Sequence, residues 1–257
     1  MGKYTRGLML ALYLLVSVPA VATELEGRLD WVNRVALSIP VSGVIHEVGV
    51  ETGARVKKGT VLAKLDPRPF ALHVRAARAR LKSRKLQRDE AQRELGRARE
   101  LYERTLLSDH DLQLATIGYE TAEADYQLAV ASLKQAELDR EYSTLRAPFN
   151  AIVVQRLAVV GQTVAASMQP PVLFVLADGD HMRVRAVVGT AQLGDLHVGD
   201  EVRIQTGGRT YPGRLVFVAR EPAGEGSPAA PRYEVVFEFA VDAGTLHVGQ
   251  AAQVTLP

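Results

Sequence analysis

The chain has 257 residues, of which 47% are hydrophobic and 23% charged, and this composition excludes a fully disordered or collagen-like protein. It contains no cysteine, which excludes a disulfide framework, thiolate metal sites and a thiol nucleophile. The formal net charge of +2 comes from Lys3 and Arg6, since the remainder carries 29 basic and 29 acidic residues. A neutral chain does not attract polyanions, so we expect no nucleic-acid partner.

The first 22 residues have the three parts of a secretion signal. Lys3 and Arg6 form a basic start, residues 8–18 are apolar, and residues 20–22 supply the small-x-small pattern of a cleavage site. The apolar run is shorter than the roughly 20 residues of a membrane-spanning helix. We therefore expect a signal peptide over residues 1–22 and a periplasmic mature chain, while retention of the segment as an anchor stays open.

The rest of the chain divides into three segments of different amino-acid composition. Residues 24–66 contain short Val- and Ile-rich pieces separated by glycines, which is typical of strands. Residues 68–143 are poor in glycine and proline and rich in Ala, Leu, Arg, Glu and Gln, which favours helix. Residues 147–257 return to short Val-rich runs broken by glycine and proline, and these predict strands again.

The helical segment has a hydrophobic period of about 3.5 residues in two stretches. Steps of three and four residues starting at Val74 meet apolar or aromatic residues, except at Arg84 and Arg88. The same steps starting at Leu112 meet bulky residues that alternate with alanines. We call each set of these positions a seam. Two such apolar seams are typical of two helices that pack closely as a left-handed coiled coil.

A turn is predicted between the two stretches. Ser108 is a natural N-cap, and Asp109 and Asp111 fall in the first helical turn, where the helix dipole favours them. Residues 68–107 hold 12 Arg and Lys against 5 Asp and Glu, whereas residues 109–142 hold 2 against 8. The sequence therefore predicts an antiparallel helical hairpin with oppositely charged arms, each roughly 50 Å long at about 1.5 Å per residue.

The segments on either side of the predicted hairpin resemble each other. Residues 43–56 can be laid on residues 151–164 at a constant offset of 108. Two equivalent halves predict one small β domain with the hairpin inserted in its middle. A further repeat, Leu196-His-Val-Gly199 and Leu246-His-Val-Gly249, predicts turn-plus-strand units of a second β domain.

Three motifs carry a family resemblance. Val56-Lys-Lys-Gly-Thr-Val-Leu-Ala-Lys-Leu-Asp66 precedes the hairpin, and Thr144-Leu-Arg-Ala-Pro-Phe-Asn-Ala-Ile-Val153 follows it. Arg97, Leu101 and Ser108 have the spacing Arg-x3-Leu-x6-Ser. In these motifs and their order the chain resembles the membrane-fusion family, the HlyD-like periplasmic adaptor subunits of tripartite pumps, and the third motif resembles members that serve resistance-nodulation-division (RND) transporters. After the hairpin the family has Asp-Gly where this chain has Asn-Ala.

The resemblance covers nearly all of residues 24–257 and implies an α+β fold. This fold is a split lipoyl-like β-sandwich with an inserted long antiparallel α-helical coiled-coil hairpin, plus a β-barrel domain. We also expect a short member that lacks the membrane-proximal domain of pump adaptors. The implied divisions are a signal peptide (1–22), an N-terminal strand joining the β-barrel (23–39), the first lipoyl-like half (40–66), the hairpin (67–145), the second lipoyl-like half (146–178) and the β-barrel (179–257).

The resemblance also implies a function. The chain is expected to link an inner-membrane efflux transporter to an outer-membrane channel, and to assemble as a ring of six copies that seals the export conduit. Arg97, Leu101 and Ser108 are expected to contact the channel, with the arginine donating to backbone carbonyls and the leucine serving as an apolar knob. The same residues also fit an ordinary exposed arginine, a core leucine and a helix cap.

No enzyme chemistry is predicted. Residues 108–111 contain the letters of a catalytic triad, but consecutive helical residues point in different directions and cannot act on one another. The sequence has no phosphate-binding loop of the Walker type, and we expect no cofactor and no metal. Two alternatives stay open: an adaptor of an ATP-driven exporter, and a periplasmic substrate- or metal-binding protein, which would need a convergent pocket.

Overall fold

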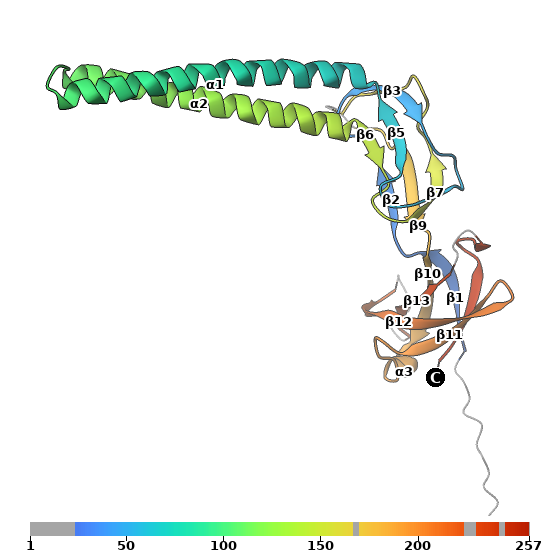
Figure 1. Cartoon of the computed structure of the whole chain (residues 1–257). Helices are drawn as coiled ribbons and strands as arrows, with labels where there is room; N and C mark the ends of the chain where they lie inside the picture. Colours follow the sequence, from blue (N-terminus) through green and yellow to red (C-terminus); the bar gives the residue numbers. More distant parts are fainter. Residues whose placement is uncertain (1–23, 167–169, 224–229, 242–244, 257) are drawn as a thin grey trace, which may run out of the picture. The chain divides into compact units, whose positions relative to one another are not determined.

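The computed structural model describes residues 24–166, 170–223, 230–241 and 245–256 (Figure 1). The expected signal peptide, residues 1–22, lies outside the described residues. Within the described ranges, no helix has both the length and the apolar character needed to cross a membrane. The chain divides into two compact units, one of residues 29–183 and 240–249, and one of residues 184–239 with the described parts of 1–28 and 250–257.

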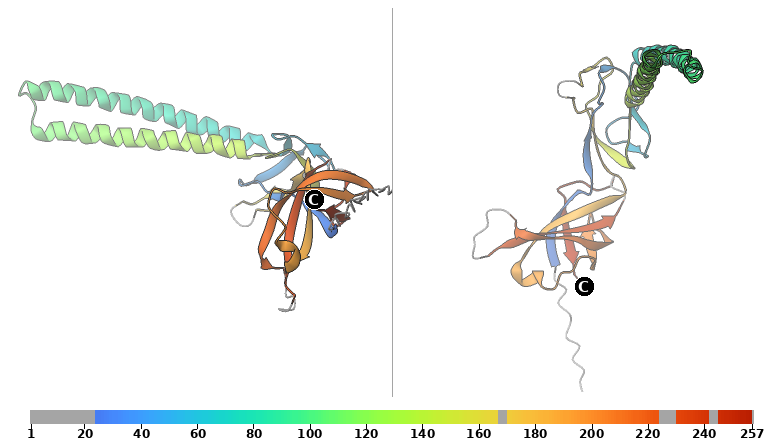
Figure 2. Two further views of the ribbon diagram at one scale, coloured as in Figure 1. Left: turned by 90° about the horizontal axis from the view of Figure 1, so that it is seen from below. Right: turned by 90° about the vertical axis from the view of Figure 1, so that its left-hand side faces the viewer.

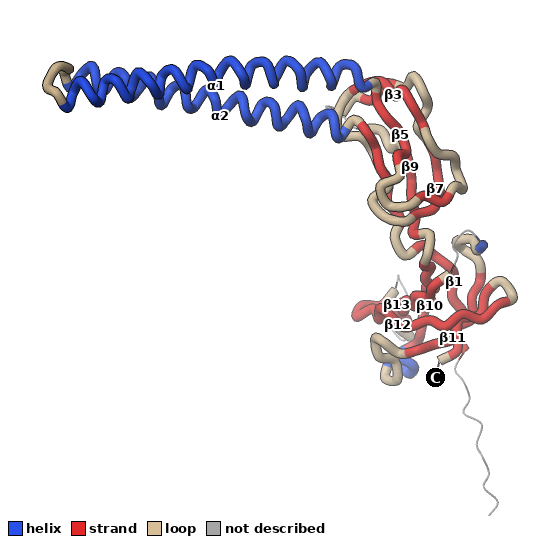
Figure 3. The backbone as a smooth tube through the Cα atoms, viewed as in Figure 1, coloured by secondary structure: helices blue, strands red, loops and turns tan. Residues whose placement is uncertain are grey.

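The first unit contains two four-stranded sheets (Figure 3). One sheet has the order β2 (Arg34–Leu37), β9 (Phe174–Asp178), β7 (Ala151–Arg156), β4 (Arg55–Val56). The other has the order β6 (Thr144–Arg146), β5 (Val61–Leu65), β3 (Gly43–Val48), β8 (Thr163–Val164). Together they form the split lipoyl-like β-sandwich that the sequence predicts.

The two halves of the sandwich exchange their short strands. Strand β4 of the first half pairs with β7 of the second, and β8 of the second half pairs with β3 of the first. Gly53 and Gly161 hold the equivalent turns at φ of 84° and 88°, a left-handed conformation that glycine adopts without a steric penalty. The internal repeat at an offset of 108 residues therefore becomes a pseudo-twofold sandwich in which neither half is closed alone.

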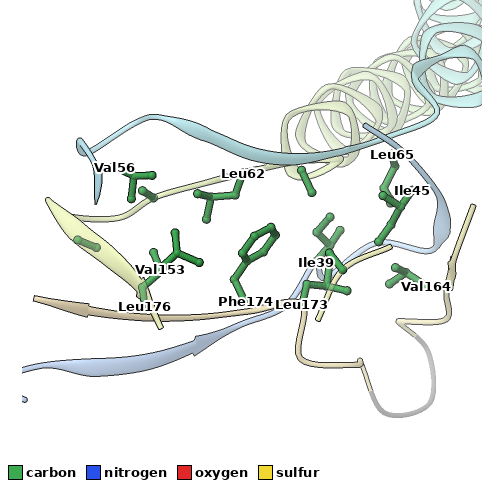
Figure 4. Packing of buried hydrophobic residues seen from close by; sticks show 14 of the residues in the cluster. Ile39, Ile45, Val56, Leu62, Leu65, Val153, Val164, Leu173, Phe174 and Leu176 are labelled. Carbon is green, nitrogen blue, oxygen red and sulfur yellow. The ribbon is translucent and has the colours of Figure 1, made fainter. Parts of the chain in front are cut away.

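The core of the sandwich lies between the two sheets and is mostly aliphatic (Figure 4). Phe174, Leu62 and Leu176 are fully buried there. Phe70 comes from the first turn of the following helix and joins the same buried cluster. The start of the hairpin is thus anchored in the sandwich core through an aromatic side chain.

The hairpin consists of α1 (Pro67–Glu103) and α2 (Asp109–Tyr142), which lie side by side (Figure 2). Along the chain it connects β5 to β6. Val74, Leu95 and Ala129 are buried, and all three belong to the predicted seams. The coiled-coil hairpin expected from the 3.5-residue period is therefore present. At about 1.5 Å per residue, α1 is roughly 55 Å long.

The two arginines that interrupt the α1 seam meet acidic partners on α2. Arg84 pairs with Asp125 at 3.0 Å, and Arg88 lies 3.6 Å from Glu123. The Arg88 guanidinium also stacks over the ring of Tyr126, with its central carbon 4.7 Å from the ring centroid. A polar layer in an apolar seam favours one register, because any slip would separate the charges.

Asp66 caps the first helix and bears a perturbed carboxyl. Its Oδ1 accepts a hydrogen bond from the Arg68 backbone N–H at 3.0 Å, and the Arg68 guanidinium binds the same carboxylate at 2.6 Å. These hydrogen bonds from Arg68 lower the pKa of Asp66 from 3.8 to about 2. A depressed folded-state pKa stabilises the fold above the unfolded pKa, and this stabilisation is lost as the pH falls through the folded value.

The stability of the chain is therefore expected to fall between about pH 4 and pH 2, in part through Asp66. In Asp66→Asn the amide still caps the helix but cannot ionise, so this variant should show a smaller loss of melting temperature between pH 5 and pH 2.5. Thermal unfolding followed by far-UV circular dichroism measures both losses. Equal losses in the two proteins would show that Asp66 does not contribute.

The remaining strands form a closed six-stranded barrel with the order β1-β10-β13-β12-β11-β14. Their bounds are β1 (Glu24–Trp31), β10 (His181–Gly189), β13 (Arg232–Ala240), β12 (Arg209–Pro222), β11 (Glu201–Thr206) and β14 (Ala251–Thr255), and a short helix α3 (Thr190–Leu193) follows β10. The expectation for residues 23–39 needs a correction. Only β1 joins the barrel, whereas β2 pairs with β9 of the sandwich, because Leu37 packs against the sandwich core.

Candidate functional site

The free end of the hairpin is a tight, well-defined turn. After α1 the N–H of Thr105 donates to the carbonyl of Tyr102 at 2.8 Å, and the N–H of Leu106 donates to that of Leu101 at 2.9 Å. This pair of bonds is a Schellman motif, which usually has glycine where Thr105 stands. Thr105 has a φ of 57°, which costs a β-branched residue about 1–2 kcal/mol. The turn therefore holds a strained residue in a fixed conformation.

Ser108 starts the second helix, as the sequence predicts. Its Oγ accepts from the Asp111 N–H at 3.2 Å and donates to the Asp111 carboxylate at 2.7 Å. A hydrogen bond to Asp109 raises the pKa of Tyr102, so the end of α1 is also tied to the start of α2. These contacts hold the tip through side chains as well as backbone. Ser108 therefore caps α2, independently of any contact with a partner protein.

Arg97 lies on α1 in a network of charges. Its Nη2 binds Glu94 and, at 3.2 Å, Glu90, and these two partners raise the pKa of the guanidinium. Glu90 also accepts from Arg93, and the two arginines lower the pKa of Glu90. The Arg97 side chain is 54% exposed, and its Nε and Nη1 take no part in the two bonds. The guanidinium is thus held through Nη2, while more than half of the side chain stays exposed.

Leu101 is exposed and stands at the position of the Schellman motif that typically contacts the residue after the turn, here Leu106. Leu106 is the more exposed of the two, at 71%. Leu114 and Ile117 at the start of α2 are also exposed. We call Leu101, Leu106, Leu114 and Ile117 the tip patch.

Sequence reasoning found Leu101 but missed the other three members of the tip patch. The signal that marks Leu114 and Ile117 is an apolar residue outside the seam positions of its helix. Arg97 and Leu101 are four residues apart and therefore share one face of α1, with Ser108 across the turn. The three predicted residues lie at the same end of the hairpin; Arg97 forms ion pairs and Ser108 caps α2, whereas Leu101 is exposed and is not a core leucine.

Two further features of the described chain bear on ligand binding. No group of three or more His, Asp or Glu side chains that could hold a metal ion occurs among the described residues. The barrel has a groove of about 580 Å³ next to the Gly207-Gly208 turn, lined by Glu26, Arg28, Gln205 and Gln253 together with small residues. This lining contains no aromatic side chain, unlike most small-molecule pockets.

Comparison with known proteins places the chain in a family. A family model described as "CzcB-like, barrel-sandwich hybrid domain" matches residues 33–178, which include the sandwich and the hairpin. The chain is 30% identical over 247 residues to the macrolide export protein MacA of Escherichia coli O157:H7, covering 89% of this chain and 66% of that protein. It is 33% identical over 187 residues to MacA of Yersinia pestis, covering 67% and 50%. It therefore spans between half and about two thirds of these relatives.

Solved structures agree on the fold. The membrane fusion protein Spr0693 from Streptococcus pneumoniae R6 matches with a TM-score of 0.70 at 16% identity, covering 92% of this chain and 99% of that one. A MacA-MexA chimera, which carries the Pseudomonas aeruginosa MexA α-hairpin domain, matches with a TM-score of 0.66 at 23% identity, covering 91% and 78%. The chain belongs to the membrane fusion protein family, and residues 33–178 are its CzcB-like barrel-sandwich hybrid domain.

Proposed function

We propose that the chain is a periplasmic adaptor that links an inner-membrane efflux transporter, of the RND type, to an outer-membrane channel. The observation that carries the proposal is a long two-helix hairpin, which is anchored in a sandwich at one end and ends in a capped turn with an ion-paired arginine and exposed leucines at the other. Relatives named as a macrolide export protein and a multidrug resistance protein support efflux as the process.

The mechanism would be spacing, sealing and coupling rather than catalysis. Several copies would form a ring whose hairpins enclose a conduit across the periplasm, and the barrel, residues 179–257 with β1, would face the transporter. The transporter would supply the energy. The charge layer of Arg84 and Arg88 would keep the two helices in register, so that every copy presents its tip at the same height.

Docking at the tip would use two kinds of contact. Arg97 would donate its Nε and Nη1 hydrogens to carbonyls of the channel, because Glu90 and Glu94 hold the guanidinium through Nη2. Leu101 and Leu106 would bury apolar surface against the channel, and Ser108 would place its hydroxyl at the contact while it caps α2. The spacing of Arg97, Leu101 and Ser108 is the reason to propose an RND partner.

The proposal can be tested by crosslinking in cells. Because the natural chain has no cysteine, Leu106→Cys gives a single reactive position at the tip, which a photoactivatable maleimide can link to the channel. In this background Arg97→Asp should reduce the crosslink and drug export by at least about tenfold, since the carboxylate would repel the carbonyls. Arg99→Asp is the matched control, because Arg99 is also exposed but lies on another side of α1.

The outcomes separate the candidate functions. Equal crosslinking in both arginine variants would show that Arg97 does not contribute to docking, and no crosslink to a channel from Leu106→Cys alone would remove the tip from the docking site. Mass spectrometry of the membrane proteins that co-purify with the adaptor would identify the transporter, and an ATPase in place of an RND protein would support the alternative exporter class. Export that is independent of any channel would contradict the adaptor function itself.

A further inference from the structure

The groove of the barrel is lined by polar side chains that have no partner among the described residues. It has a volume of about 580 Å³ and lies on β1, β14 and β11, next to the turn that joins β11 to β12. Glu26, Arg28, Gln205 and Gln253 belong to its lining and are exposed. Within the described ranges, no hydrogen bond or ion pair joins the side chain of any of these four to another residue. Their hydrogen-bond donors and acceptors are therefore available to a ligand.

The groove arises because long side chains lie beside short ones. One row across β1, β14 and β11 consists of three long polar residues, which the strand register sets next to one another: Glu26, Gln253 and Gln205. The neighbouring row starts at Arg28, which pairs with Ala251 of β14, and continues toward Gly207 in the turn. Because alanine is short and glycine has no side chain, this second row leaves an open space between the Arg28 side chain and the turn.

The wall that the turn forms is held in place. Thr206 and Arg209 pair directly, so the turn consists of Gly207 and Gly208, both with a positive φ. The hydroxyl of Thr206 donates to the carbonyl of Ala251 at 3.0 Å, and this bond ties the turn to β14. A wall of glycine backbone lets the backbone of a ligand approach more closely than a side chain would allow.

Two opposite charges stand on the same face of the groove. Glu26 and Arg28 are two residues apart on β1, so they point to one side of the strand and lie about 7 Å apart along it. Two residues of an extended peptide also span about 7 Å. A guanidinium binds a carboxylate through two parallel hydrogen bonds, and a carboxylate accepts the hydrogens of an ammonium group. The pair can therefore hold both ends of a short peptide at once.

The two glutamines supply groups for the peptide bond between those ends. The amides of Gln205 and Gln253 each carry an oxygen that accepts and a nitrogen that donates, and these match the N–H and the C=O of a peptide. The lining has no aromatic side chain on which the apolar body of a drug would lie. The groove thus favours a ligand that is charged at its ends and contains amides over an apolar ligand.

We propose that the groove of the barrel binds short peptides of two or three residues with free amino and carboxyl ends. Arg28 binds the carboxylate, Glu26 binds the ammonium group, and Gln205 and Gln253 hydrogen-bond the peptide amides. All of these residues belong to the barrel unit of one copy. The proposal therefore goes beyond the proposed function and does not depend on a ring, a channel or a transporter.

Calorimetric titration of the purified full chain with the dipeptide Ala-Ala tests the site. We expect saturable binding with a dissociation constant below about 1 mM. N-acetyl-Ala-Ala lacks the ammonium group and Ala-Ala amide lacks the carboxylate, so each should bind at least about tenfold more weakly than Ala-Ala. No saturable binding of Ala-Ala up to about 10 mM would overturn the proposal.

Variants assign each end of the peptide to its residue. Arg28→Gln should bind Ala-Ala and its amide equally well, and Glu26→Gln should bind Ala-Ala and its N-acetyl form equally well, because each variant lacks the group that recognises one end. Arg203→Gln is the matched control, since Arg203 is exposed on β11 outside the groove and its loss should leave the affinity unchanged. Equal affinities in the Arg28→Gln and Arg203→Gln proteins would overturn the role of Arg28 and with it the site.

A bulky residue in the groove gives an independent test. Ala251 is exposed on β14, so Ala251→Leu should keep the melting temperature of the natural chain while its side chain fills the open space and abolishes binding of Ala-Ala. Unchanged binding in a folded Ala251→Leu protein would place the peptide elsewhere and contradict the proposal.

Glucuronate tests a second class of ligand. It carries a carboxylate and hydroxyl groups but no ammonium group, so it should bind at least about tenfold more weakly than Ala-Ala. Tighter binding of glucuronate than of Ala-Ala, unchanged in Glu26→Gln, would contradict the assignment to peptides. These titrations use the chain without a partner, so their failure is distinguishable from a failure of the crosslink at the hairpin tip.

Discussion

Replacing Phe174 by alanine is expected to lower the free energy of unfolding by about 3–5 kcal/mol. Phe174 is fully buried and stands in β9 between β2 and β7, facing Leu62 of the opposite sheet across the core (Figure 4). Its removal opens a cavity between two sheets, and the hydrogen bonds within each sheet keep its strands from collapsing to fill the cavity. Each half of the sandwich contributes a strand to the other's sheet, so the lost packing at Phe174 destabilises both halves.

Urea unfolding followed by far-UV circular dichroism measures this change. Phe217→Ala is the matched control, because that ring is 49% exposed in β12 and its truncation should cost less than about 1 kcal/mol. Phe174→Leu should recover much of the loss, since most of the buried volume is kept. A similar midpoint shift for the Phe174→Ala and Phe217→Ala proteins would contradict the assignment of Phe174 to the core.

The parts of the fold that the sequence predicts well are those whose signal is local and repeated. Val74 and Leu95 belong to a long seam, so a few polar residues such as Arg84 do not hide the period. The internal repeat predicted two equivalent halves because it compares the chain with itself. The cap at Ser108 followed from its residue type and from the acidic residues after it.

Strand partners could not be predicted in the same way. Strand β2 has only four residues, and nothing in them distinguishes a partner in the barrel from β9 in the sandwich. The exchange of β4 and β8 between the halves involves strands of two residues, too short for any periodic pattern. Pairing over more than 90 residues is decided by the core that the strands cover.

The channel contact expected of the hairpin tip stays a prediction, and the structure shows where its residues lie. Arg97, Leu101 and Ser108 were identified by spacing, whereas Leu106 and Ile117 become evident only when the turn is seen to expose them. Each of the three predicted residues also serves the hairpin itself, through an ion pair, a Schellman position or a cap. For this reason the useful variants alter the contact while they leave the cap and the turn intact.

Gly27→Ala is expected to destabilise the barrel by about 2–3 kcal/mol, although it adds a single methyl group. A Cβ at Gly27 would lie 2.5 Å from the Cγ1 of Val184 and 2.8 Å from the carbonyl oxygen of Arg185. Val184 is fully buried, and the carbonyl belongs to the backbone of β10, so neither can move aside. Gly27 is also paired with Ala252 of β14, which holds β1 from the other side.

The fluorescence of Trp31, the only tryptophan, reports on unfolding of β1 in urea. Gly189→Ala is the matched control at the end of β10, since a Cβ there meets no atom within 4 Å and the backbone is extended. The control should unfold at the same urea concentration as the natural chain. An equal midpoint for Gly27→Ala would mean that β1 can move away from β10, and a strand with that freedom could not close the barrel.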